Sequence, residues 1–212
     1  MSNVPAEPLL ILCGGLSRRM GSPKPLLECR GQSLIERHVA AALPERPVWL
    51  AAADCRYPNT EGAHYLDDAL DGREGALSAI LPALQQAKAE GFSGIYVMSC
   101  DTLITPPQLI ACLKTAEHSS AWQQGWVALA DAADAEGRVR SHPLLAHWST
   151  ALAERLSESL TTGNRRVMRF LDKEIQQSVT MPTSWQAFTN FNTPEDFQRA
   201  LTEWEQTCHS PI

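Results

Sequence analysis

The segment that most constrains the fold is a short apolar run, Leu9 to Cys13, which ends directly at Gly14-Gly15. Five consecutive apolar residues closed by glycines predict a strand buried on both faces, the usual environment of a strand in a parallel sheet. Further apolar runs follow at 48–51, 65–66, 95–98 and 126–129. Amphipathic segments separate these runs, so the sequence predicts an α/β fold whose mainly parallel sheet is flanked by helices.

The segments between and after the apolar runs predict the helices. Helices are expected at 33–43, at 76–90, from Pro106, at 148–160, at 165–171 and from Thr193. Ser33 and Glu36 have the spacing of a capping box, and Pro82 predicts a kink. Residues 131–141 are charged, which predicts a loop. Residues 188–191 are predicted to form a short strand. We expect one domain over 9–206, with an extension at 1–8 and a tail at 207–212.

Composition excludes several classes of protein. The 212 residues carry a net charge of −6, which argues against a nucleic-acid coat or a binder of anionic membranes. No apolar stretch approaches the roughly 20 residues of a membrane span, and residues 1–8 lack the basic start of a secretion signal. The six cysteines form no Cys-x-x-Cys pair, so we expect reduced thiols in a cytoplasmic protein.

A cationic loop follows the first predicted strand. Gly14-Gly15 allows close approach of a ligand to the backbone, and Arg18, Arg19 and Lys24 bring three cations into an otherwise acidic chain. This combination is expected around a triphosphate. Prolines flank Lys24, so the loop is not a P-loop, and it lacks the third glycine of the dinucleotide fingerprint.

Asp101 ends another predicted strand, within Ser99-Cys100-Asp101-Thr102. A carboxylate at the carboxyl end of a strand and facing a phosphate loop is well placed to hold Mg²⁺, which needs only one or two protein carboxylates. On its own, such an aspartate is more often a turn former or a helix cap. The neighbouring phosphate loop favours a metal ligand, but it does not by itself decide between these roles.

The segment 12–27 resembles the signature of the nucleotidyltransferases that build molybdenum cofactors, and more narrowly the molybdenum cofactor guanylyltransferase family. It carries the pattern Leu-x-Gly-Gly-x-Ser-Arg-Arg-Met-Gly-x-x-Lys-x-Leu-Leu. Cys-Asp-Thr at 100–102 matches the family's metal motif, and the similarity runs to about Phe197. The resemblance implies a three-layer Rossmann-like nucleotidyltransferase fold. It further implies nucleotide contacts from Leu12, Cys13, Gly14, Gly15, Lys24 and Asp101.

Later motifs resemble the same family and suggest where the second substrate binds. They are Arg140-Ser141-His142-Pro143, Gly163-Asn164-Arg165-Arg166-Val167-Met168 and Asn190-Phe191-Asn192-Thr193-Pro194-Glu195. The resemblance implies that the anionic pterin contacts residues within them, namely Arg140, Arg165, Arg166, Asn190 and Asn192. His142 is expected to be a structural hydrogen-bonding residue, because the implied chemistry needs no base.

Two further positions bear on the nucleotide. Asp68 lies in a stretch similar to one where the family has an aspartate near guanine, although Asp67 is an alternative and both could be solvated charges. After the second long apolar run, the family places an asparagine in the nucleotide pocket. This chain has three alanines at 51–53 followed by Asp54. A contact to guanine or ribose must therefore be lost, moved or supplied by Asp54.

The resemblance implies Mg²⁺-dependent transfer of GMP from GTP to the terminal phosphate of molybdenum-molybdopterin, with Lys24, Arg19 and Asp101 as the catalytic residues. A molybdoenzyme or its chaperone would receive the product, and no nucleic acid or membrane is involved. A cytidylyltransferase or sugar-phosphate nucleotidyltransferase of the same fold is an alternative. A non-catalytic carrier of the finished cofactor is another.

Overall fold

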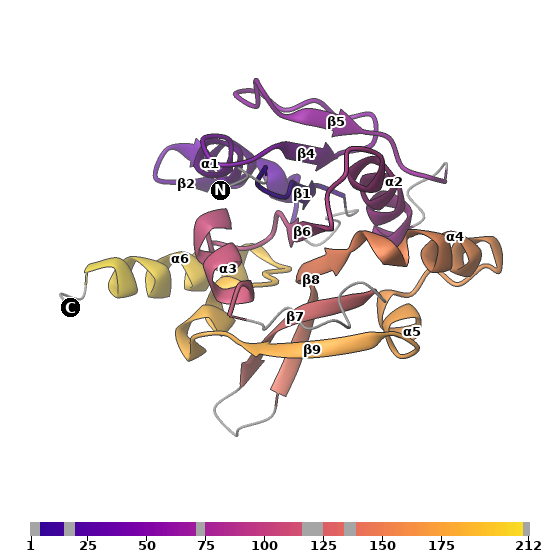
Figure 1. The fold of residues 1–212 in the computed structure, drawn as a ribbon. Coiled ribbons are helices and arrows are strands. Elements are labelled where there is room, and N and C mark those ends of the chain that lie inside the picture. The colour runs from indigo at the N-terminus through magenta and orange to yellow at the C-terminus, as the bar shows by residue number, and fades with distance from the viewer. Residues whose placement is uncertain (1–4, 15–19, 71–74, 116–124, 134–138, 210–212) are drawn as a thin grey trace.

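The computed structural model describes residues 5–14, 20–70, 75–115, 125–133 and 139–209 (Figure 1). A seven-stranded sheet has the order β5-β4-β1-β6-β8-β7-β9. Its strands are β1 (Leu9–Leu12), β4 (Val48–Ala51), β5 (His64–Leu66), β6 (Gly94–Ser99), β7 (Trp126–Ala133), β8 (Val139–Ser149) and β9 (Ile175–Thr180). β8 is antiparallel to both of its neighbours, and the other strand pairs are parallel. The predicted mainly parallel sheet is confirmed.

The strand order reverses direction at β1. From β1 the chain moves outward through β4 to β5, and then returns to form β6 on the other side of β1. The crevice outside the carboxyl ends of two such strands is where open α/β sheets bind ligands. Gly14 follows β1 and Asp101 follows β6, so both predicted site segments lie at this switch point.

Helices cover both faces of the sheet and complete three layers. They are α1 (Leu34–Ala42), α2 (Ala76–Ala89), α3 (Pro106–Leu113), α4 (Ala153–Thr161), α5 (Val167–Leu171) and α6 (Pro194–His209), with short 3₁₀ turns η1 (Lys24–Leu26), η3 (Thr150–Leu152) and η4 (Thr183–Phe188). Figure 1 shows α1, α3 and α6 on one side of the sheet and α2, α4 and α5 on the other. The expected three-layer fold is confirmed.

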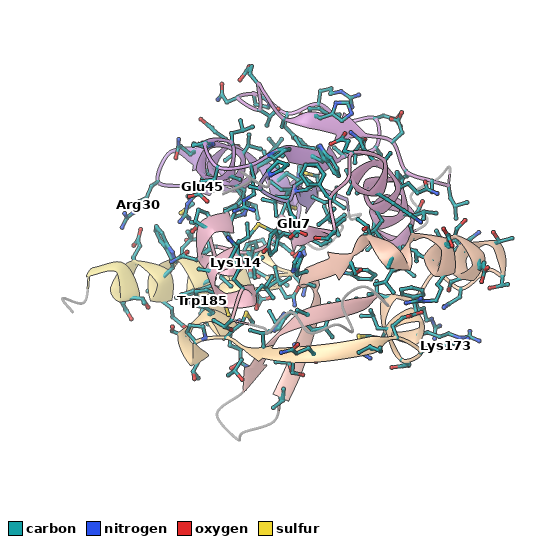
Figure 2. The ribbon with its side chains drawn as sticks, in the orientation of Figure 1. Glu7, Arg30, Glu45, Lys114, Lys173 and Trp185 are labelled. Atoms are coloured by element: carbon teal, nitrogen blue, oxygen red, sulfur yellow. The ribbon has the colours of Figure 1, made fainter. Side chains whose placement is uncertain are left out.

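Each face of β1 contributes to a separate hydrophobic core. Leu9 and Ile11 pack into the core under α1, α3 and α6, while Leu10 and Leu12 pack into the core under α2, α4 and α5. All four side chains are buried. Figure 2 shows side chains filling both interlayer spaces, with charged ones such as Lys173 extending outward at the rim. Burial on both faces explains why this strand has no alternation of polar residues.

Helix boundaries agree with the local signals in the sequence. The Ser33 hydroxyl accepts a hydrogen bond from the Glu36 amide (3.3 Å) and caps α1. Thr105 caps α3 directly before Pro106. Thr193 caps α6 by accepting from the Asp196 amide (3.2 Å). Among the described residues, no helix has the length and apolar character needed to cross a bilayer.

Several expectations for the second half of the chain were wrong. The stretch 131–141 is not simply a loop, because β7 continues to Ala133 and β8 begins at Val139. Trp148 lies in β8 and not in a helix, because it pairs with Ile95 and Val127. The predicted strand at 188–191 is instead the end of η4 and a loop with one isolated bridge. The strand β9 and the small hairpin of β2 (Glu28–Cys29) and β3 (Gln32–Ser33) were not anticipated.

Candidate active site at the carboxyl edge of the sheet

Lys24 is held in a stiff turn. It begins η1 between Pro23 and Pro25, and the proline rings fix the backbone angle φ on both sides. The Leu26 amide donates to the Pro23 carbonyl at 3.0 Å, and the Leu27 carbonyl accepts from the first residue of α1 at 2.9 Å. The prolines that rule out a P-loop therefore fix the backbone from which the Lys24 side chain extends.

Lys24 and Asp101 meet at the switch point. The Lys24 ammonium donates to Asp101 Oδ2 at 2.8 Å, and the two side chains are 15% and 16% exposed. Residues that are 77 positions apart in sequence thus form a partly buried ion pair. The parallel alignment of β1 with β6 accounts for this contact, because Leu12 lies opposite Ser99 and both strands end at the same edge.

The predicted asparagines complete a ring of hydrogen bonds around this pair. Lys24 Nζ donates to Asn192 Oδ1 at 3.1 Å, and Asn192 Nδ2 donates to the Asn190 carbonyl at 3.0 Å. The Asn190 amide then donates to the Asp101 carbonyl at 3.0 Å. The structure therefore brings together four of the predicted site residues, drawn from three distant segments.

His142 contacts this ring from β8. Its Nδ1 lies 3.2 Å from Asn190 Nδ2, and the side chain is buried. Burial, together with the positive charge of Arg140, lowers the pKa of His142, while the carboxylates of Asp131 and Asp101 oppose the shift. The imidazole is therefore neutral at neutral pH and suits a hydrogen-bonding role.

One carboxylate oxygen of Asp101 has no hydrogen-bond partner among the described residues. Oδ2 is bound to Lys24, whereas Oδ1 is buried with no hydrogen-bond partner among the described residues. A hard carboxylate oxygen at this position fits a magnesium ion whose other ligands are phosphate oxygens and water. The described residues contain no cluster of three or more His, Cys, Asp or Glu side chains able to hold a metal. Asp101 thus fits a site completed by substrate.

The backbone after β1 is accessible. Cys13, the residue after β1, is held at the end of the sheet because its amide donates a hydrogen bond to the Ala51 carbonyl (2.9 Å), and Gly14 is exposed. A Cβ atom built on Gly14 would meet nothing within 4 Å among the described residues. Gly15 and Arg19 lie outside the described residues.

The thiols beside this edge are not charged. Burial raises the pKa of both Cys13 and Cys100 well above the ordinary thiol value. Cys29 is also buried. These three cysteines therefore fill core space, as the sequence suggested.

The positions that the sequence assigned to the nucleotide lie at the same edge of the sheet. Asp68 follows β5, which lies two strands from β1, or about 10 Å at the usual strand spacing. Ala51 and Ala52 are buried at the end of β4, Ala53 has a left-handed φ of 48°, and Asp54 is exposed. The end of β4 thus presents no side-chain amide.

The predicted arginines separate into two places. Arg140 is exposed on β8, two residues from His142. Arg165 and Arg166 are exposed just before α5, and a Cβ built on Gly75, which precedes α2, would lie 3.6 Å from the Arg165 carbonyl. The backbone of Arg165 therefore lies close to the residue that precedes α2, whereas Arg140 lies on β8.

Two contacts next to Asp101 and Asn190 were missed from the sequence. His142 was expected to form hydrogen bonds, but its partner Asn190 was not identified. His38 was not singled out, yet its Nε2 lies 3.1 Å from the carbonyl of Thr102, next to Asp101. A histidine inside the apolar stripe of α1 was the available signal.

Comparison with known proteins shows the family of this chain. The model of the MobA-like NTP transferase domain matches residues 9–178, which is most of the chain. The chain belongs to this family. A molybdenum cofactor guanylyltransferase from Rhizobium meliloti (strain 1021) is 33% identical over 211 residues, covering 94% of this chain and 92% of that protein. One from Pasteurella multocida (strain Pm70) is 35% identical over 194 residues, covering 89% and 96%.

Solved structures support the fold of this MobA-like chain. Molybdopterin-guanine dinucleotide biosynthesis protein A from Archaeoglobus fulgidus superposes with a TM-score of 0.66 at 22% identity, covering 94% of this chain and 99% of that one. 2-C-methyl-D-erythritol 4-phosphate cytidylyltransferase from Thermus thermophilus superposes with a TM-score of 0.63 at 17% identity, covering 95% and 100%. The nucleotidyltransferase fold expected from the sequence is therefore confirmed.

Proposed function

We propose that this enzyme transfers GMP from GTP to the terminal phosphate of molybdenum-molybdopterin, forming molybdopterin guanine dinucleotide and pyrophosphate. The observation that carries the proposal is the Lys24–Asp101 ion pair, 2.8 Å long, at the switch point of a MobA-like transferase fold. Curated relatives of nearly the same length are named molybdenum cofactor guanylyltransferases, and this narrows the nucleotide and the acceptor.

In this reaction an oxygen of the acceptor phosphate bonds to the α-phosphorus of GTP, and the bond from that phosphorus to the oxygen of the leaving pyrophosphate breaks. The nucleophile is already an anion, so no strong general base is required. The main task of the protein is to align the two phosphates and stabilise charge on the leaving group. Lys24 and Arg19 are proposed for charge stabilisation, with the backbone of Gly14 and Gly15 holding the triphosphate.

Mg²⁺ is the proposed cofactor, and Asp101 would hold it through the carboxylate oxygen that lacks a partner among the described residues. When bound, it would supply positive charge between two polyanionic substrates. Lys24, which also donates to Asn192, holds the other carboxylate oxygen and fixes the orientation of the carboxylate.

The remaining predicted residues are assigned by position. Leu12, Cys13 and Asp68 are proposed for the nucleotide, because they lie at the ends of β1 and β5. For the pterin we propose Arg140, Arg165, Arg166, Asn190 and Asn192. A cytoplasmic location and delivery to a molybdoenzyme or its chaperone complete the proposal.

The main alternative to this proposal is an enzyme of the same fold that uses a nucleotide other than GTP. The alanines at the end of β4 provide no amide for a base, and a cytidylyltransferase has a similar fold. The test is release of pyrophosphate from GTP, CTP, ATP or UTP in the presence of molybdopterin and Mg²⁺. Our proposal predicts release with GTP above the other three. Faster release with another nucleotide would contradict the proposal and identify that nucleotide as the substrate. Tight binding of the finished cofactor without release of pyrophosphate would indicate a carrier.

A further inference from the structure

We infer that His142 is a positioning residue for the transfer site, because its Nδ1 holds the side chain of Asn190 and thereby the loop that also carries Asn192. The inference rests on the proposed function for its consequence in catalysis. The contact itself is independent of that function. His142 is not expected to touch either substrate.

The contact has a defined direction. The Asn190 side-chain nitrogen can only donate, so the imidazole Nδ1, 3.2 Å away, must accept. The proton of the neutral ring is then on Nε2, which is buried with no partner among the described residues. An unpaired buried N–H costs stability, so a side chain chosen for packing alone would be apolar. The acceptor at Nδ1 is the property that this position supplies.

The anchored Asn190 side chain belongs to a residue with an uncommon backbone conformation. Its φ is +56°, in the left-handed region that L-residues rarely adopt. In this conformation its amide reaches the Asp101 carbonyl and its carbonyl accepts from Asn192 Nδ2, both at 3.0 Å. A change in the backbone conformation of Asn190 would therefore alter two hydrogen bonds of the ring around Lys24 at once.

His142 is fixed more firmly than the loop it contacts. It lies on β8, where it pairs with Ala130 of β7. Asn190 lies in the connection between η4 and α6. A site is more precise when its loops are tied to a strand or helix of the scaffold. The hydrogen bond from Asn190 to His142 makes that tie.

Two amide substitutions distinguish the role of Nδ1 from that of Nε2. His142→Asn places an amide oxygen near the position of Nδ1, whereas His142→Gln carries the same group further out, near Nε2. Both are uncharged, and both replace the ring with a smaller polar side chain. We would measure kcat and KM for GTP, the thermal midpoint, and hydrogen exchange in peptides covering 188–193 for each variant.

The inference predicts that His142→Gln lowers kcat by roughly 10- to 100-fold, the range for residues that orient a metal ligand or its neighbours. KM for GTP should stay within about threefold. His142→Asn should retain most of the activity, and exchange at 188–193 should rise only in His142→Gln. Equal activity and exchange in the two variants would overturn the inference, as would losses that follow only the thermal midpoint. If the wild type transfers no guanylyl group, the proposed function fails, and the exchange comparison still decides the positioning role.

Discussion

Replacing Lys24 with methionine should remove the positive charge proposed for catalysis while keeping most of the apolar stem. The ammonium lies 2.8 Å from Asp101 Oδ2 and 3.1 Å from Asn192 Oδ1, and its side chain is only 15% exposed. Charges in a partly desolvated site interact more strongly than in water. Loss of one such stabilising group typically costs 10²- to 10³-fold in kcat, or about 3–4 kcal/mol. We expect Lys24→Met to show a loss of this size.

The assay is the rate of pyrophosphate release with saturating GTP, Mg²⁺ and molybdopterin. Asp101 loses its ion-pair partner in this variant, so stability should fall by about 1–3 kcal/mol, between the values for exposed and fully buried pairs. Rates should therefore be compared well below the thermal midpoint of the variant. A kcat within a few-fold of wild type would remove Lys24 from the mechanism.

Lys88 offers a matched control. It forms an ion pair with Glu154 at the same distance of 2.8 Å, but the two side chains are 52% and 83% exposed and lie on α2 and α4. Solvent screens such a pair. Lys88→Met should leave kcat and the thermal midpoint almost unchanged. A large loss of activity here would show that removing any lysine perturbs the enzyme.

Three other predictions follow from the same contacts. Asp101→Asn should raise the Mg²⁺ concentration needed for half-maximal activity, with partial recovery in excess Mg²⁺; an unchanged Mg²⁺ titration would contradict its role as ligand. Asn190→Ala should be less stable than Asn190→Gly by about 1 kcal/mol in urea unfolding, because only glycine adopts the left-handed φ freely; the opposite order would contradict the strain. Burial lowers the pKa of His38 to about 4 from 6.5, so unfolding takes up a proton and stability should fall as the pH drops from about 6.5 to about 4, by on the order of 3 kcal/mol. His38→Gln, which keeps a donor for the Thr102 carbonyl, should reduce this fall, and an equal fall in both proteins would assign it to other groups.

The part of the site that local sequence could predict is the part that lies at strand ends. An apolar run closed by glycines identified β1, and a second run identified β6 before Asp101. Parallel strands end at one edge, so the approach of Lys24 to Asp101 followed from two local patterns. The ring around them did not follow from spacing. Asn190 and His142 are 48 residues apart, and nothing local indicates their contact.

The errors in the second half arise where local composition and tertiary structure disagree. β7 and β8 carry the charged residues Asp131 and Arg140 near the end of their pairing, so this stretch of sequence resembles a loop. β9 is an edge strand with the sequence Ile-Gln-Gln-Ser-Val-Thr, and only Val179 is fully buried. Its pairing with β7 supplies the stability that its own side chains do not.

The most direct test of the central claim is the footprint of GTP and Mg²⁺ in amide hydrogen exchange on the wild-type enzyme. We predict slower exchange at 12–14, at 24–27 and at 101–103 when both are present, and weaker protection at all three when Mg²⁺ is removed. These segments lie at and just after the carboxyl ends of the two strands of the switch point and in the Lys24 turn. Protection confined to other parts of the chain, with these three segments unchanged, would contradict the assignment of the nucleotide site.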